Sequence, residues 1–398
     1  MDSLFPFDSI RPTQREFIEA VEEACKKKTH AVLHAPTGVG KTAASLAPAL
    51  EYALAHDKVI FFLTSRHTQH AMALETLELI QARTGESFCV LDLIAKQKMC
   101  PLAHMQHLGS AEFGQYCREA RETRNCRCYA NTKKSDGVLT EDGEHVVSLL
   151  QTKIHRSEDI ISQGKEYELC PYEVAMAAAE KARVIIADYY YIFHDAIRIP
   201  FLVRMQRELS EVIVIVDEAH NLPDRIKNLA STRLSTIGLQ RAITEADKAE
   251  QEDALTIIQD IYRGFNALFD EEEFQDQVVD KAFFEDLVSE AGDYEEMMDT
   301  LEDIGLRMLQ EKRQSSILSL AVFMAHWRQD IEGFVRILSL DMKQNPVLAL
   351  DHRCLDPSVV AGNIINKCHS VVCMSGTLRP MRMYGDLLGF SPETTRYE

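Results

Sequence analysis

Six short apolar runs, separated by helical patterns, constrain the fold of this chain more than any other feature. The runs span His30–His34, Val59–Thr64, Phe88–Leu91, Val184–Asp188, Glu211–Asp217 and Ser370–Met374, and the helical patterns span Lys41–Ala55 and His67–Arg83. Strands that are apolar on both faces and alternate with helices are typical of a parallel sheet covered by helices. The sequence therefore predicts an α/β fold.

The first run leads into a glycine-rich loop, Ala35-Pro-Thr-Gly-Val-Gly-Lys-Thr42, which opens a helical pattern. In this context backbone N–H groups and the helix N-terminus can hold phosphate oxygens. Lys41 is expected to reach the β- and γ-phosphates of ATP, and the Thr42 hydroxyl is expected to ligate Mg²⁺. The candidate nucleotide-binding residues of this P-loop are Gly38, Gly40, Lys41 and Thr42.

A second motif, Asp217-Glu-Ala-His220, follows another buried run. Asp217 can bind Mg²⁺ at the sheet edge, and Glu218 can position or deprotonate the attacking water, which is most of what phosphoryl transfer requires. His220 is expected to link the γ-phosphate site to a nucleic-acid side. Upstream, Arg11 and Gln14 are placed either to recognise adenine or simply to begin a helix.

Between the two motifs lies a polar stretch with five of the ten cysteines, Cys100, Cys117, Cys126, Cys128 and Cys170. Such a stretch can hardly build a large core alone, so we expect a bound metal centre to stabilise it. Thiolates suit either an iron–sulfur cluster or tetrahedral zinc, and the spacing lacks the paired Cys-x₂-Cys knuckles common in zinc modules. The other five, Cys25, Cys89, Cys354, Cys368 and Cys373, are predicted core residues.

The net charge of −19 is concentrated in residues 245–303, which carry 21 acidic and three basic side chains. This segment lies within residues 229–350, whose long patterns of helical period predict a mostly helical inserted domain. A solvated acidic surface is one interpretation of the charge, and a docking face for a protein partner is the other.

Neither a secretory signal nor a membrane span is expected. The N-terminus has no basic region followed by an apolar run, and no apolar stretch approaches ~20 residues. We therefore expect an intracellular protein that is cytoplasmic, near the nucleoid, in an archaeon or bacterium, and nuclear in a eukaryote.

The chain resembles the superfamily 2 iron–sulfur helicases of the XPD type, with DinG-like helicases as the nearest alternative. The matching elements are Ala35–Thr42, Thr64–Gln69, Lys98–Cys100, Leu169–Tyr172, Asp217–Pro223, Cys354–Pro357 and Met374–Leu378. They occur in family order across almost the whole chain.

This resemblance implies a RecA-like P-loop parallel sheet with an inserted Fe–S domain and an inserted mostly helical arch domain. Residues 1–95, 175–228 and 351–377 are expected to form the first motor domain, 96–174 the Fe–S domain, 229–350 the arch, and 378–398 the start of a second, truncated motor domain. It also implies ATP-driven 5′→3′ translocation on single-stranded DNA, in DNA repair.

The resemblance further assigns a 4Fe–4S cluster to Cys100, Cys117, Cys126 and Cys170, with Cys128 as an alternative to Cys126. It assigns DNA contacts to Lys96, Ser65, Arg66, Thr68 and Gln69. Asp188-Tyr-Tyr-Tyr191 matches a family motif near the DNA path or is a core tyrosine run. Single strands and single-strand/double-strand junctions are the expected nucleic-acid partners, and a monomer is the expected state.

The chain contains no Gln-x-x-Gly-Arg-x-x-Arg motif, which would supply arginines to the γ-phosphate. Such arginines are typically worth ~10³–10⁵ in rate. We therefore expect the N-terminal portion of a helicase that binds ATP and DNA but unwinds little alone. The competing hypothesis is a non-catalytic DNA-binding or scaffold module.

Overall fold

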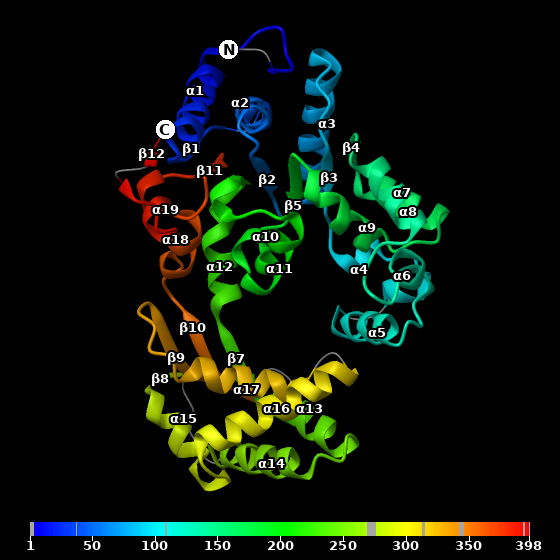
Figure 1. Cartoon of the computed structure of the whole chain (residues 1–398). Helices are drawn as coiled ribbons and strands as arrows, with labels where there is room; N and C mark the ends of the chain where they lie inside the picture. Colours follow the sequence, from blue (N-terminus) through cyan, green and yellow to red (C-terminus); the bar gives the residue numbers. More distant parts are fainter. Residues whose placement is uncertain are drawn as a thin grey trace. The chain divides into compact units, whose positions relative to one another are not determined.

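The computed structural model describes residues 4–36, 38–107, 110–268, 276–312, 315–341, 346–392 and 395–397. Contacts divide the chain into two units (Figure 1). The motor unit comprises residues 1–107, 124–229 and 357–398, and the arch unit comprises residues 108–123 and 230–356.

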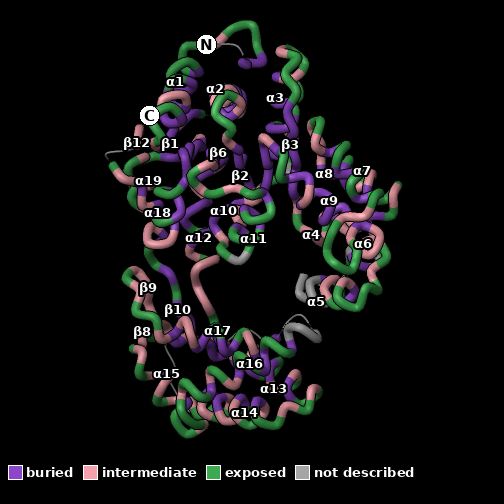
Figure 2. The backbone as a smooth tube through the Cα atoms, in the orientation of Figure 1, coloured by how far each residue is buried: buried purple, intermediate pink, exposed green. Residues whose placement is uncertain are grey.

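The motor unit is built on an eight-stranded parallel sheet in the order β12-β1-β11-β6-β2-β5-β3-β4, which confirms the predicted α/β class. The strands are β1 His30–His34, β2 Val59–Leu63, β3 Val90–Asp92, β4 Ile154–His155, β5 Val184–Ala187, β6 Val212–Asp217, β11 Ser370–Ser375 and β12 Thr395–Tyr397. The central strands are buried along their length, as Figure 2 shows for β2 and β6.

Alternate residues of these strands enter two different cores, one on each face of the sheet. Phe61 and Val214 belong to one core, and Phe62 and Ile215 to the other. The first face is covered by α9 Pro171–Ala178, α10 Tyr190–Phe193, α11 Asp195–Met205, α12 Leu222–Ala230 and α18 Ser358–Ile365, the second by α1 Pro12–Lys27, α2 Lys41–Ala55 and α3 His67–Thr84. Burial on both faces explains why the strand sequences are continuously apolar.

Residues 96–174 differ from the separate domain that the sequence suggested. They form α4 Lys96–Met99, α5 Ser110–Glu122, α6 Arg127–Thr132, α7 Glu141–Leu150, β4 and α8 Ser157–Glu166. Their buried apolar residues Val146, Leu150 and Ile160 join the first core of the main sheet. Strand β4 extends that sheet beside β3, while α5 is grouped with the arch unit.

The arch unit contains a sheet that the sequence analysis did not anticipate. The antiparallel strands β7 Thr232–Ser235, β8 Gln277–Val279, β9 Phe334–Asp341 and β10 Val347–Cys354 pair in the order β7-β10-β9-β8. Because β7 is short with one buried residue and β8 is short with none, they carry little apolar signal. Strand β10 also crosses the boundary expected at residue 350, and the unit runs to Asp356.

Helices nevertheless supply most of the arch unit's core. They are α13 Thr236–Lys248, α14 Glu252–Ala267, α15 Lys281–Leu287, α16 Tyr294–Lys312 and α17 Ser316–Trp327. Phe284 lies at the centre of an aromatic cluster with Phe265, Phe323 and Trp327, at ring-centroid distances of 5.6–6.3 Å. No helix among the described residues is long and apolar enough to cross a membrane.

Candidate functional site

The P-loop joins the end of β1 to the start of α2, as the sequence predicts. Gly38 and Gly40 have φ values of +85° and +87°, which glycine adopts without strain. A Cβ at Gly40 would lie 2.6 Å from the Gln14 side-chain nitrogen, so no larger residue fits there without a shift. Thr42 lies half-buried in the first turn of α2. Thr37, within the same loop, lies outside the described residues.

Arg11 and Gln14 lie against this loop at the start of α1. The Arg11 guanidinium donates to the Gly38 carbonyl at 3.2 Å, and the Gln14 side chain donates to the Val39 carbonyl at 2.7 Å. Gln14 is buried, and its own carbonyl oxygen accepts from the Arg11 N–H at 3.0 Å. These contacts show that both residues support the P-loop backbone, whereas adenine recognition stays a prediction.

Lys41 and Asp217 provide opposite charges at the carboxyl edge of the sheet. The Lys41 ammonium donates to the Ala35 carbonyl at 3.1 Å. Burial and the neighbouring Glu218 carboxylate raise the pKa of Asp217 to about 6, and the charge of Lys41 opposes this rise. At the end of β1, burial and the positive charges of Arg379 and Lys41 lower the pKa of His34. Lys41 and Arg379 therefore place positive charge at this end of the sheet, beside the carboxyl groups of Asp217 and Glu218.

Glu218, His220 and the hydroxyl of Ser375 meet at the end of β11, where His220 Nδ1 lies 3.2 Å from a Glu218 carboxylate oxygen. This hydroxyl donates to a Glu218 carboxylate oxygen at 2.9 Å and lies 2.8 Å from His220 Nδ1. Because its single proton goes to Glu218, the serine oxygen accepts from His220, as it does from the Thr377 N–H at 3.3 Å. Sequence matching had picked out Ser375–Thr377 without a partner, and only strand pairing brings it to the acidic motif.

A cavity of about 370 Å³ opens beside the segment after β2. Lys96 lies at its wall with its ammonium 4.9 Å from the centroid of the Tyr172 ring, a cation–π contact. The structure thus brings Lys96 and Ser65 to one cavity, while Arg66 and Thr68 are exposed nearby in sequence and Gln69 contacts Thr64. The cavity is lined by Thr64, Ser65, His70, Leu93, Ile94, Ala95, Lys96, Tyr172, Asp188, Tyr190, Tyr191 and Ile197.

The tyrosines of Asp188–Tyr191 divide between a cavity and the core, and their place near a DNA path stays a prediction. Tyr190 and Tyr191 line the cavity, whereas Tyr189 is 1% exposed and belongs to the core. Burial also raises the pKa of Asp188 at the cavity wall.

The ten cysteines divide as the sequence predicts. The five outside the insert are buried, and the five within it are half-buried. Burial, followed by the thiolates of Cys126 and Cys100, raises the pKa of Cys128 to about 11, so these three lie within electrostatic range of one another. Cys170 contacts α6, the helix that carries Cys128, because its N–H donates to the Thr132 hydroxyl at 2.7 Å.

The donor set of the insert suits an iron–sulfur or zinc centre, because thiolates are the ligands that both prefer. Cys117, however, lies on α5 in the arch unit, whereas Cys100, Cys126, Cys128 and Cys170 lie in the motor unit. Within the described residues no three Cys, His, Asp or Glu side chains converge as metal ligands. The cysteines are therefore candidates by chemistry, and the geometry assigns no ligand set.

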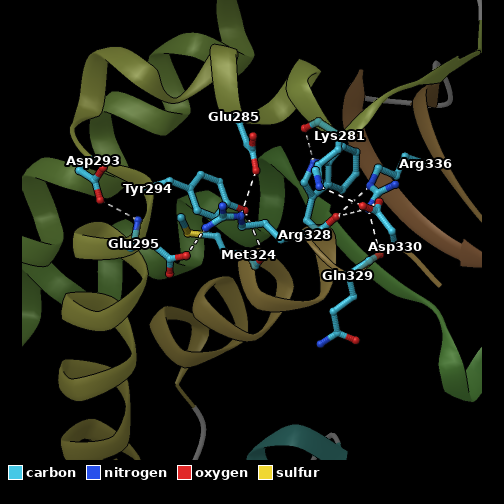
Figure 3. Close-up of polar contacts among 11 residues, drawn as sticks. Lys281, Glu285, Asp293, Tyr294, Glu295, Met324, Arg328, Gln329, Asp330 and Arg336 are labelled. Atoms are coloured by element: carbon cyan, nitrogen blue, oxygen red, sulfur yellow. Dashed lines mark hydrogen bonds and ion pairs between the residues drawn. The ribbon is translucent and has the colours of Figure 1, made fainter.

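The acidic segment of the arch unit is partly neutralised within its own unit (Figure 3). Arg328 pairs with Glu295 and, at 3.0 Å, with Glu285, and its guanidinium lies 5.3 Å from the centroid of the Tyr294 ring. Arg336 donates to the Trp327 carbonyl at 2.8 Å and contacts Asp330 at 3.1 Å. The Arg328 contacts link α15, α16 and the end of α17, and the Arg336 contacts link β9 to the end of α17.

The DEAD_2 family model matches residues 62–239, which include the segment after β2, the cysteine insert and the acidic motif. Among relatives, the general transcription and DNA repair factor IIH helicase subunit XPD of Schizosaccharomyces pombe is 24% identical, over 98% of this chain and 60% of its own. The ATP-dependent DNA helicase XPD of Sulfolobus acidocaldarius is 27% identical, over 72% of this chain and 46% of its own. The chain thus spans only part of the length of these relatives.

Solved structures agree on the fold. A structure described as truncated XPD matches with a TM-score of 0.60 and 21% identity, covering 96% of this chain and 98% of its own. An XPD helicase matches with a TM-score of 0.59 and 20% identity, covering 98% of this chain and 62% of its own. By family model and relatives the chain is similar to the XPD helicases, and the solved XPD structures share its fold.

Proposed function

We propose that this chain is the ATP-hydrolysing motor portion of a 5′→3′ DNA helicase of the XPD type that acts in DNA repair. The observation that carries the proposal is the meeting of two distant motifs at one sheet edge. Lys41 acts electrostatically on Asp217, and Glu218 is held by Ser375 on the strand that pairs with β1. This is the placement that phosphoryl transfer requires.

Each residue then has a chemical role. Lys41 and the N–H groups of the P-loop bind the β- and γ-phosphates, and Thr42 and Asp217 hold Mg²⁺. A bound Mg²⁺ favours the ionised form of Asp217. Glu218 orients the attacking water, and its hydrogen bond from Ser375 fixes one of its carboxylate oxygens.

Single-stranded DNA is the proposed nucleic-acid ligand. Sequence-tolerant binding of single strands combines cationic groups with aromatic stacking surfaces. Lys96 with Tyr172, Tyr190 and Tyr191 supplies both at the cavity. Ser65, Arg66, Thr68 and Gln69 supply donors for the backbone phosphates beside it.

Binding and hydrolysis test this proposal together. We expect the chain to bind Mg·ATP and a labelled oligo-dT, and to hydrolyse ATP slowly. Lys41→Ala should abolish nucleotide binding and leave DNA binding within about twofold. Lys367→Ala, which changes an exposed lysine in the turn after α18, should change neither. DNA binding without any ATP binding would refute the motor function and favour the scaffold alternative.

We also propose that Cys100, Cys117, Cys126 and Cys170 hold a 4Fe–4S cluster. The proposal rests on the half-buried thiols of the insert and on the XPD relatives. Iron, labile sulfide and zinc should be measured on anaerobically purified protein. Four irons and four sulfides per chain are expected, to be lost in Cys170→Ser and Cys126→Ser and kept in Cys128→Ser. One zinc per chain would replace the cluster by a structural zinc site.

A further inference from the structure

A buried histidine–aspartate pair lies at the wall of the cavity that carries Lys96. His70 is in the first turn of α3 and lines the cavity, and Asp92 is the last residue of β3. Their side chains are only 8% and 5% exposed. Both residues belong to the motor unit, and neither has a part in the nucleotide site or in the DNA contacts proposed above.

The hydrogen-bond partners of His70 define its protonation state. Nδ1 lies 2.5 Å from an Asp92 carboxylate oxygen, and Nε2 lies 3.4 Å from the Thr64 carbonyl oxygen. The other Asp92 oxygen accepts from the Ser157 N–H, at the start of α8, at 3.2 Å. Carboxylate and carbonyl oxygens only accept hydrogen bonds, and only the imidazolium form of histidine carries a donor on each ring nitrogen. The pair is therefore an imidazolium beside a carboxylate.

A second carboxyl group lies at the same cavity. Asp188 follows β5 and lines the cavity, where burial raises its pKa and the charges of Arg225 and His70 oppose the rise. Lys96 supplies a positive charge at the same wall. Without the charge of His70, Asp92 would add a buried negative charge beside Asp188. Because charges interact more strongly where water is excluded, this charge would repel a phosphate chain.

His70 also contacts the backbone that precedes Ser65. The Thr64 N–H donates to the Ala187 carbonyl at 2.9 Å, which continues the pairing of β2 with β5. The Thr64 hydroxyl contacts the Gln69 side chain, and the Thr64 carbonyl faces His70 Nε2. The imidazolium therefore holds the carbonyl group that leads directly into Ser65, one of the residues proposed to bind DNA.

We propose that His70 is a positioning residue for DNA: its imidazolium neutralises Asp92 beside the cavity and holds the backbone that leads into Ser65. This inference rests on the proposed function and names a further determinant of DNA binding at the same cavity. Loss of one ring proton leaves the Nδ1–H on Asp92 and turns Nε2 into an acceptor that faces the Thr64 carbonyl. Two acceptors then face each other, the Asp92 charge is uncompensated, and DNA binds more weakly.

The test is the affinity for labelled oligo-dT as a function of pH, without nucleotide and at constant ionic strength. Wild type should bind about fivefold more weakly at about pH 9 than at about pH 6, because histidine loses its charge in this range. Asp188 and Asp217, whose pKa values are raised, add their own pH dependence. The reference is therefore His70→Gln, which should bind weakly throughout and show only the part that these carboxyl groups contribute.

Substitution of Asp92 separates this role from a purely structural one. In Asp92→Asn, the amide oxygen can accept from the Ser157 N–H and the amide N–H can donate to His70 Nδ1. Nε2–H then donates to the Thr64 carbonyl, so a neutral His70 satisfies every group and the His70-dependent pH change should disappear. The double variant His70→Gln/Asp92→Asn has no unpaired charge and should bind within about twofold of wild type at about pH 6, whereas independent structural losses would add.

His145→Gln, the same substitution at an exposed position of α7, is the matched control and should keep the wild-type pH dependence. Circular dichroism and Mg·ATP binding report whether each variant folds, and Asp92→Asn serves if His70→Gln does not. The inference is overturned if His70→Gln or Asp92→Asn keeps the full wild-type pH profile, or if the double variant binds as weakly as His70→Gln. Those results leave the proposed function intact, whereas a wild type that binds no oligo-dT at any pH overturns the proposed function itself.

Discussion

The nucleotide site and the cysteine region are held in different ways. At the nucleotide site, residues from α1, β1, β6 and β11 meet because a single parallel sheet sets their register, and short hydrogen bonds lock them. The cysteine region has short helices, one two-residue strand and cysteines divided between two units. A sheet edge therefore preorganises its chemistry, whereas the cysteines lie on short helices and loops with local contacts such as that of the Cys170 N–H with Thr132.

The largest expected effect is at the preorganised site. Glu218→Gln should lower single-turnover ATP hydrolysis by roughly 10²–10⁴-fold, because it removes the group that positions the water. Nucleotide affinity should change little, since the P-loop is untouched. Asp224→Asn, an exposed carboxylate on α12, is the control and should hydrolyse ATP as wild type does. Equal rates in Glu218→Gln and wild type would remove Glu218 from the mechanism.

The second effect separates the two units. Trp327 is fully buried in the arch core, so Trp327→Ala should destabilise that unit by about 3–5 kcal/mol. Chemical unfolding followed by circular dichroism should show an early transition, with Mg·ATP binding by the motor unit retained. Simultaneous loss of nucleotide binding would show that the two units unfold as one.

A third prediction concerns the free energy of unfolding that is lost because the Asp217 carboxyl group is buried. The pKa of Asp217 is raised from 3.8 to about 6, so the folded chain holds this proton more tightly than the unfolded chain. Its contribution to stability is present below pH 4 and is lost as the pH rises through 6. Asp217→Asn should therefore unfold with about 1–3 kcal/mol more free energy than wild type at pH 7.

Comparing Asp217→Asn with wild type at a second, lower pH provides the control. The difference between Asp217→Asn and wild type should nearly disappear at about pH 3, below both pKa values, where the wild-type carboxyl is mostly protonated in the folded and the unfolded state. Denaturant unfolding at the two pH values, without Mg²⁺, measures it. An asparagine variant that is less stable at pH 7 would show that the aspartate carries an unrecognised stabilising contact.

The smallest effect is expected in the cysteine region. Thr132→Val keeps the shape of the side chain but removes the acceptor for the Cys170 N–H and a donor to the Cys128 carbonyl at 2.7 Å. The loss should be about 1 kcal/mol in denaturant unfolding, with a faster loss of bound metal to a chelator. Thr152→Val, which removes an exposed local hydrogen bond, is the matched control.

Much of the motor unit could be predicted because its signals are local. The bounds of β1 and α2 agree with the apolar runs and the P-loop, and β2, β5, β6 and β11 agree within one or two residues. Strands buried on both faces need continuous apolar sequence, so they can be recognised without their partners. The arch sheet could not be recognised in this way, because β7 has a single buried residue and β8 has none.

The sequence by itself determined the identities of the reactive groups. Lys41 begins a helix, and Asp217 and Glu218 come at the end of a strand, and both elements can be recognised from their sequence patterns. Only the tertiary structure decided which groups touch. Ser375 reaches Glu218 across 157 residues, Gln14 supports the P-loop, and the Tyr189 hydroxyl donates to the Asp217 carbonyl. The physical reason is that strand order and register, set by packing of both faces of the sheet, bring these side chains within hydrogen-bond distance, and no local pattern encodes that order.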